Sequence, residues 1–252
     1  MILMNDNQKI KLHGFNNLTK NLSFSFYKIS YLVNLDHKRQ YNDHINKLYN
    51  ASQLAILLAD ICHAVGGNIL NIAQQDYQPQ GASVTLMISE EARPESLVAH
   101  LDKSHICIHT YPEDNPLNNI AIFRADIELS TCGVISPLKV LNYLLEEFDA
   151  DVIDIDYRVR GMTRDSQGIK KFNDQEVNNI SDYISESLLL KYQYHNRNLV
   201  LNNIFFSKLC RKEINLNNNL FLLTQVELPT TKREAIIKQI DKELQQLCTN
   251  YH

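Results

Sequence analysis

Two neighbouring segments of this chain alternate strictly between apolar and polar side chains, and this alternation limits the fold more than any other feature. Within Ala121–Cys132 the odd positions up to residue 129 are apolar, and the even positions from Arg124 onward are polar. Within 104–110, Ile106 and Ile108 alternate with two histidines and a cysteine. Successive side chains of a β-strand point to opposite faces of the sheet. If these strands pair, one sheet face is apolar and packs against helices, while the other collects imidazoles, thiols and carboxylates.

The rest of the chain predicts an α/β fold with mainly antiparallel strands. Period-2 alternation predicts strands, and apolar residues at three- and four-residue spacing predict helices. Further strands are expected at Leu22–Phe26, Ile69–Ala73, Ala82–Ser89 and Val152–Arg160. Helices are expected from Asp36 to about Val65, from Ser136-Pro137 through Phe148, from Asn173 to about Lys191 and from about Thr231 to Cys248. No linker or repeat forces a split, so residues 1–252 are interpreted as a single domain.

Composition excludes several classes of protein. The chain has 252 residues, 44% of them hydrophobic and 21% charged, which is typical of a globular protein with a substantial core. Its formal net charge of −4 gives no basic footprint and argues against a nucleic-acid partner. No apolar run is long enough to span a bilayer, so no membrane partner is expected. The five cysteines are odd in number and scattered without a CxxC pair, which predicts a reduced, cytoplasmic protein.

The same two segments carry the most reactive side chains of the chain. Ser104, His105, Cys107 and His109 lie within six residues, and Cys132 ends the second strand. Histidine titrates near neutral pH, and serine and cysteine are the usual nucleophiles. The triplet of His105, Cys107 and His109 could instead hold zinc, and a third interpretation is a binding module without catalysis. Cysteines taken alone are small buried hydrophobes, an interpretation kept here for Cys62, Cys107, Cys210 and Cys248.

Several separate motifs resemble the bacterial S-adenosylmethionine decarboxylase proenzymes, in the longer form found in Gram-negative bacteria. The central motif is Lys103-Ser-His-Ile-Cys-Ile-His-Thr-Tyr-Pro-Glu113, followed by Ser130-Thr-Cys-Gly133. The others are Lys11–Lys20, Asp76–Val84 and Asp156–Gly161. The resemblance covers roughly residues 9 to 190 and fades after that. A combination of this length is far more specific than a short pattern match.

The resemblance implies that the precursor cuts itself before its motif serine, here at the Lys103–Ser104 bond. The Ser104 hydroxyl would attack the Lys103 carbonyl and turn the amide into an ester. Loss of the Ser104 α-proton would then release residues 1–103, the β chain. Hydrolysis would leave a pyruvoyl group at the head of residues 104–252, the α chain. That carbonyl would condense with the substrate amine as a Schiff base and act as the electron sink for decarboxylation.

Individual roles are carried over by motif position. His109 matches the base that accepts the α-proton during processing, a task for a group with a pKa near working pH. Ser83 matches a serine that supports processing through hydrogen bonding. Cys132 matches the proton donor of catalysis, and a thiol with an ordinary pKa of about 8.5 suits that role. Because the substrate carries a sulfonium, aromatic and acidic lining residues are expected, and the candidates are Tyr111, Glu113 and Phe15.

The resemblance also implies an assembly and a reaction. The expected fold is a two-layer α/β sandwich, a mainly antiparallel sheet with helices on one face, whose protomers pair sheet to sheet into an αββα arrangement. The expected assembly is a homo-oligomer of cleaved α/β pairs. The expected activity is pyruvoyl-dependent conversion of S-adenosyl-L-methionine to S-adenosylmethioninamine for spermidine biosynthesis. Stimulation by Mg²⁺ rests on the resemblance alone, because no local cluster of ligands marks a metal site.

Overall fold

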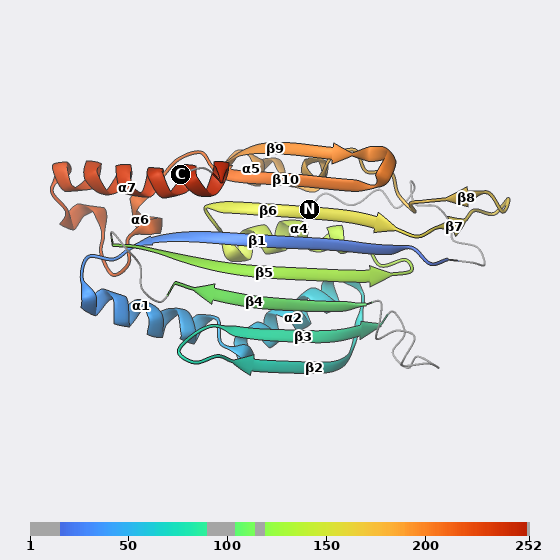
Figure 1. Cartoon of the computed structure of the whole chain (residues 1–252), viewed down its shortest axis with the longest axis horizontal. Helices are drawn as coiled ribbons and strands as arrows, with labels where there is room; N and C mark the ends of the chain where they lie inside the picture. Colours follow the sequence, from blue (N-terminus) through green and yellow to red (C-terminus); the bar gives the residue numbers. More distant parts are fainter. Residues whose placement is uncertain (1–15, 90–103, 114–118, 251–252) are drawn as a thin grey trace.

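The computed structural model describes residues 16–89, 104–113 and 119–250, and its main feature is one eight-stranded sheet. The strand order is β2-β3-β4-β5-β1-β6-β10-β9, and every neighbouring pair is antiparallel (Figure 1). The strands of this sheet are β1 (Thr19–Tyr31), β2 (Asn68–Asp76), β3 (Ala82–Ser89), β4 (His105–Pro112), β5 (Ile120–Cys132), β6 (Val152–Arg160), β9 (Tyr192–Leu199) and β10 (Ile204–Arg211). A separate hairpin pairs β7 (Thr163–Arg164) with β8 (Lys170–Lys171). The helices are α1 (Leu35–Leu48), α2 (Ala51–Val65), α4 (Leu141–Phe148), α5 (Glu186–Leu189), α6 (Leu216–Asn219) and α7 (Thr230–Thr249).

The alternation predicted for the two central strands is confirmed along their length. On β5 the odd positions from Ala121 to Leu129 are buried, and on β4 the isoleucines are fully buried. The register pairs His105 with Ser130 and His109 with Asp126, so the polar groups of both strands share one side of the sheet. We call this side the open face and the opposite, apolar side the covered face. The predicted α/β sandwich built on an antiparallel sheet is therefore confirmed.

Helices α2 and α4 pack on the covered face, behind the sheet in Figure 1. Helix α2 presents Leu54, Leu58 and Ile61 to this core, because three- and four-residue spacing places them on one side of the helix. Its first turn is capped by Asn50, whose side chain accepts a backbone N–H at 3.0 Å. An asparagine in extended backbone starts a new helix in this way. The prediction of one continuous helix over 36–65 is therefore wrong, because Asn50 divides the segment into α1 and α2.

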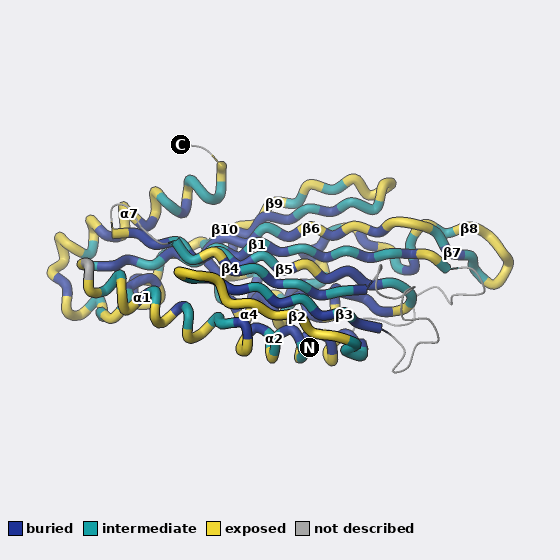
Figure 2. Tube along the Cα trace, turned by 60° about the horizontal axis from the view of Figure 1, so that its bottom comes forward, coloured by how far each residue is buried: buried dark blue, intermediate teal, exposed yellow. Residues whose placement is uncertain are grey.

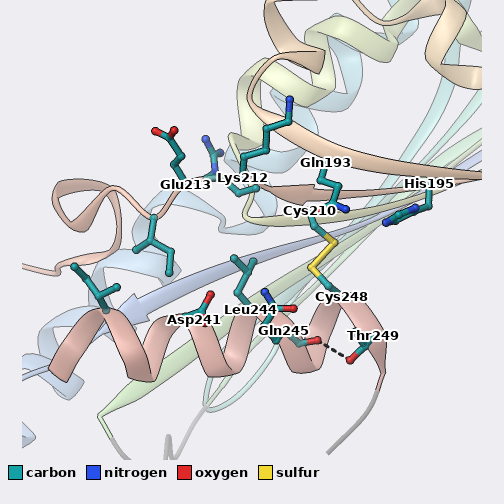
Figure 3. A pocket seen from close by; sticks show the side chains of 13 residues that line it. Gln193, His195, Cys210, Lys212, Glu213, Asp241, Leu244, Gln245, Cys248 and Thr249 are labelled. Atoms are coloured by element: carbon teal, nitrogen blue, oxygen red, sulfur yellow. Dashed lines mark hydrogen bonds between the residues drawn. A yellow bond between two sulfur atoms is a disulfide. The ribbon is translucent and has the colours of Figure 1, made fainter. Parts of the chain in front are cut away.

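Helix α7 packs across one end of the open face, a placement that the sequence did not predict. Its buried side chains, among them Ile240 and Leu244, form a second core with Ile29, which continues the open-face side of β1. A disulfide joins Cys210 on β10 to Cys248 on α7 and borders a cavity of about 560 Å³ (Figure 3). The prediction of a fully reduced chain is wrong for this pair. The two cysteines are 38 residues apart, so only the packing of α7 against β10 brings them together.

The segment predicted as a helix from Asn173 to about Lys191 is mostly irregular. Over these residues, all of which the structure describes, helical backbone is confined to a 3₁₀ turn at Ile180–Tyr183 and to α5. A capping box forms at Asn179 and opens this 3₁₀ turn. Asp174 lies in irregular backbone, and its buried carboxylate forms an ion pair with Lys20 of the distant strand β1. The helix prediction is therefore wrong for most of this segment.

The strands β10 and β9 are missing from the sequence-based prediction. Strand β10 buries Phe205 and Leu209, but Lys208 and Cys210 are also largely buried, which obscures its alternation. Strand β9 lies at the edge of the sheet and is mostly exposed (Figure 2). An exposed edge strand has no apolar side, and so its sequence carries no period-2 signal. Both strands extend the sheet beyond β6.

Candidate active site

Ser104 and Cys132 meet at one end of the sheet, where β4 begins and the antiparallel β5 ends. The Oγ of Ser104 lies 3.1 Å from the Sγ of Cys132. The backbone N–H of Cys132 donates to the same Oγ at 3.3 Å. Ser104 is 1% exposed, and its carbonyl oxygen accepts a hydrogen bond from the Ile88 N–H of β3 at 3.2 Å. The pairing of three adjacent strands therefore holds the hydroxyl and the thiol in contact.

A second cluster lies further along the open face. Strand β3 places Ser83 beside His109, and β5 places Asp126 on the other side of the same histidine. The Oγ of Ser83 is hydrogen-bonded to the phenol of Tyr77 at 2.7 Å. The ring centroids of His109 and Tyr111 are 6.5 Å apart. Tyr77 is a candidate that the sequence analysis missed, and its only signal is that it shares a motif with Ser83.

A glycine fixes the start of β3 and hence the position of Ser83. Gly81 has a φ of +94°, and a Cβ at this position would lie 2.8 Å from the carbonyl oxygen of Thr110. Only glycine tolerates both the left-handed backbone and this close approach. The next residue, Ala82, donates its N–H to the Thr110 Oγ1 at 2.8 Å. These contacts lock β3 in register with β4, so Ser83 is held opposite His109.

The two clusters do not meet within this chain. His109 follows Ser104 by five residues, which spans about 17 Å in an extended strand. A base must reach the proton it removes directly or through one water, a distance of about 3 Å to 6 Å. The structure therefore brings Ser104 together with Cys132, and Ser83 together with His109, but it does not bring the first pair to the second.

The expected substrate-lining residues are not gathered around Ser104 either. Tyr111 is half exposed on the open face, and the Arg124 guanidinium lies 4.6 Å from its ring centroid. Glu113 lies beyond the far end of β4, where its carboxylate accepts a hydrogen bond from the Ile122 N–H at 2.9 Å. Burial raises the pKa of this carboxyl, and the hydrogen bond partly offsets the rise. Outside the described residues lie Phe15 and Lys103.

Burial changes the acidity of several groups on the open face. Burial raises the pKa of the Cys107 thiol, and the nearby Glu128 carboxylate raises it further. This thiol is therefore protonated and weakly nucleophilic near neutral pH, as its interpretation as a spectator requires. Burial also raises the pKa of the Asp154 and Asp156 carboxyls. For Asp154 the rise is partly offset by the Lys208 ammonium, 3.4 Å away.

The zinc interpretation of β4 does not match the geometry. His105, Cys107 and His109 lie on the same side of one strand, so the outer two backbone positions are about 13 Å apart. Zinc ligands surround one ion at about 2 Å, which a straight strand of this length does not allow. Among the residues that the structure describes, no group of three or more His, Cys, Asp or Glu side chains is arranged to hold a metal ion.

Comparison with known proteins identifies the family. The family model described as S-adenosylmethionine decarboxylase matches residues 40–161. The S-adenosylmethionine decarboxylase proenzymes of Salmonella arizonae, Salmonella paratyphi B and Salmonella newport are each 47% identical to this chain over 254 aligned positions. Each alignment covers 95% of this chain and 96% of the relative. The similarity thus extends well beyond the residues matched by the family model.

Two solved structures resemble the chain in part. The crystal structure of the adenosylmethionine decarboxylase from Aquifex aeolicus VF5 has a TM-score of 0.36 and 16% identity, covering 58% of this chain and 91% of that one. The crystal structure of the Trypanosoma brucei AdoMetDC-delta26 monomer has a TM-score of 0.38 and 13% identity. It covers 77% of this chain and 66% of that one. At these scores neither overlay contributes to the assignment. On the near-full-length identity to the curated relatives, the chain belongs to the S-adenosylmethionine decarboxylase proenzyme family.

Proposed function

We propose that this protein is a self-processing S-adenosylmethionine decarboxylase. It converts S-adenosyl-L-methionine to S-adenosylmethioninamine, the aminopropyl donor for spermidine, and releases carbon dioxide. The observation that carries the proposal is the contact between the Ser104 hydroxyl and the Cys132 thiol. These are the residues that motif position assigns to processing and to proton donation. They are 28 residues apart in sequence, and the sheet brings them together.

The first role of Ser104 is to process the precursor. Its Oγ attacks the Lys103 carbonyl carbon, the peptide C–N bond breaks, and the proton lost by the hydroxyl passes to the freed amine. A base then removes the Ser104 α-proton, and the Cβ–Oγ bond breaks to release the carboxylate of residues 1–103. Water then hydrolyses the resulting imine, which releases the nitrogen as ammonia and leaves a pyruvoyl group on residues 104–252. The N–H of Cys132 fits this chemistry because it fixes the Oγ that attacks.

The two fragments are expected to stay together after cleavage. Strand β1 belongs to residues 1–103, yet it lies between β5 and β6 of residues 104–252 and pairs with β5 along its whole length. Strand β3 of the first fragment likewise pairs with β4 of the second. Separating the fragments would break the centre of the sheet and expose the core. A cleaved α/β pair is therefore one folded unit.

In turnover, Cys132 supplies the proton that replaces carbon dioxide on the substrate α-carbon. The pyruvoyl group provides a carbonyl that accepts electrons during decarboxylation. The thiol contacts the side chain from which that group arises, so it lies beside the reacting atoms. A donor held at one defined position protonates one carbon from one direction. This position is what the Cys132 side chain contributes to the reaction.

His109 and Ser83 are proposed to act on a second protomer. They lie about 17 Å along the sheet from Ser104 of their own chain, but both lie on the open face. That face carries charges of both signs, with Asp126, Asp154 and Asp156 against Arg124, Arg158 and Arg160. Charges of both signs on one face allow opposite charges to meet across a two-fold interface, which must be complementary to itself. Sheet-to-sheet pairing would bring the partner's His109 to Ser104 and would place Tyr111 in the shared site.

A mixed-protomer experiment tests this arrangement. Alone, His109→Ala should stop at the ester, because the α-proton is not removed, and hydroxylamine should then cleave that ester. Co-expressed with Ser104→Ala, the His109→Ala chain should be cut, because the partner's intact His109 reaches its Ser104. Mass spectrometry with a tag on one chain reads the outcome. Co-expression with the double variant Ser104→Ala/His109→Ala is the control and should give no rescue. If co-expression with Ser104→Ala does not restore cleavage of the His109→Ala chain, His109 acts on the Ser104 of its own chain.

Two further properties stay predictions. Stimulation by Mg²⁺ is expected from the resemblance, and a magnesium titration of the chelator-treated enzyme measures it. A cytoplasmic location is the second, and fractionation of the native cells measures it. Among the described residues no single helix is long and apolar enough to cross a membrane, although the bent pair Asp36–Leu48 and Ala51–Val65 passes that test jointly on length and composition.

A further inference from the structure

A buried ion pair lies on the covered face next to the residues that flank Cys132. Lys20 on β1 is 1% exposed and points to the covered face, the side of the sheet that also buries Leu18 and Leu22. Its ammonium donates to the Oδ2 of Asp174 at 2.7 Å, and that side chain is also buried. Removing two charges from water costs free energy that their attraction offsets only when the geometry is good. The burial of this ion pair is therefore weak evidence that its only role is to stabilise the fold.

The Lys20 ammonium has a second partner, the carbonyl oxygen of Gly133, at 2.9 Å. Gly133 follows Cys132, and its φ of +62° makes the turn that ends β5. The same turn is held by Thr131, whose hydroxyl donates to the Ile135 carbonyl oxygen at 3.2 Å. The peptide that follows Gly133, one residue after Cys132, is thus anchored from the covered face.

The anchor and the thiol lie on opposite sides of one short turn. The Cys132 thiol contacts the Ser104 hydroxyl, while the carbonyl of the following residue is bound to Lys20. Movement of the turn would move both the thiol and the Cys132 N–H that binds the serine. A misplacement of about 1 Å at a reacting group can cost about 10²-fold in rate. The ammonium is therefore placed to control the position of the proton donor.

We propose that Lys20 and Asp174 are positioning residues that hold the Cys132–Gly133 turn, and with it the thiol, for proton donation to the substrate. The inference rests on the proposed function. It also links the two fragments, because Lys20 lies in residues 1–103 while Asp174 lies in residues 104–252. Asp174 fixes the direction of the ammonium, and the ammonium fixes the turn.

Replacing Lys20 with methionine tests the first half of this inference. The variant should still cleave itself, but the kcat for decarboxylation should fall by about 10-fold to 100-fold with a KM close to that of the wild type. A displaced thiol should also protonate the wrong atom more often. The fraction of turnovers that end in a chemically modified N-terminus of the 104–252 fragment, measured by mass spectrometry, should therefore rise.

A double variant separates positioning from stability. Lys20→Met alone leaves the Asp174 carboxylate buried without its partner, which lowers the melting temperature. Lys20→Met/Asp174→Leu removes both charges, so the melting temperature should recover toward the wild-type value. The loss in kcat should persist, because no ammonium then holds the Gly133 carbonyl. If Lys20→Met does not fold, the double variant carries the test by itself.

Lys28 is the matched control. It lies on the same strand, about 27 Å from Lys20, and it pairs with the buried Asp151 at 3.9 Å and with the Asp149 carbonyl oxygen at 3.0 Å. Lys28→Met should lower the melting temperature but keep the wild-type kcat and the wild-type fraction of modified termini.

Two outcomes would overturn the inference. One is a processed Lys20→Met enzyme with the kcat and the fraction of modified termini of the wild type. The other is a double variant in which kcat recovers together with the melting temperature, because the pair would then only stabilise the fold. Failure of the proposed function is distinguishable, since in that case the wild-type protein itself would neither cleave nor release carbon dioxide.

Discussion

Replacing Ser104 with alanine is expected to leave one uncleaved chain without decarboxylase activity. Alanine has no hydroxyl to attack the preceding carbonyl, so the ester cannot form and no pyruvoyl group arises. Without that carbonyl as electron sink, release of carbon dioxide should fall by about 10⁶-fold or more, which is the lower range of enzymatic rate enhancements. Denaturing electrophoresis measures cleavage, and trapping of labelled carbon dioxide measures turnover.

A second buried serine of the same sheet serves as the control for this variant. Ser207 on β10 is fully buried and donates to the Asn196 Oδ1 at 2.6 Å. Ser207→Ala should lower the free energy of unfolding by about 1 kcal/mol through the lost hydrogen bond, but it should cleave and turn over normally. Decarboxylation by uncleaved Ser104→Ala at a rate near that of the wild type would rule out a pyruvoyl mechanism.

Replacing Cys132 with alanine is expected to separate processing from turnover. The Ser104 hydroxyl and the Cys132 N–H both remain, so the chain should still cut itself. Loss of the proton donor should lower kcat by about 10²-fold to 10⁴-fold, the usual contribution of a positioned acid or base. Protonation from the wrong side should also inactivate the enzyme progressively. Progress curves and the mass of the 104–252 fragment measure the two effects.

Cys107 provides the control for the thiol. It is also a half-buried cysteine in a central strand, but burial raises its pKa and its side chain lies beside Glu128 rather than Ser104. Cys107→Ala should therefore process and turn over at nearly the wild-type rate. An unchanged kcat in Cys132→Ala, with no progressive inactivation, would remove that thiol from the reaction.

The fold could be predicted from sequence where a strand is amphipathic. Strands β4, β5 and β6 bury one side and leave the other half-exposed, and the predicted range of β6, Val152–Arg160, matches the structure. Elements held by distant contacts could not be predicted. The 173–191 segment has a local helix signal, but its backbone is mostly irregular and its Asp174 is paired with Lys20 of the distant strand β1. The disulfide of Cys210 with Cys248 depends on the packing of α7.

The candidate site was predictable to a similar degree. The motifs named Ser104 and Cys132, and antiparallel pairing of their strands brings them into contact. The five-residue spacing between Ser104 and His109 is visible in the sequence. It separates the two side chains widely only because β4 is an extended strand paired on both sides. The anchoring of Gly133 by Lys20 joins residues 113 positions apart, so no local pattern could reveal it.

The intact mass of the freshly purified wild-type protein under denaturing conditions tests the central claim most directly. We expect two species, residues 1–103 and residues 104–252. The mass of the 104–252 fragment should be lower than the mass calculated from its sequence by one ammonia, because the N-terminal serine has become a pyruvoyl group. A single species with the mass of the whole unmodified chain would contradict the account.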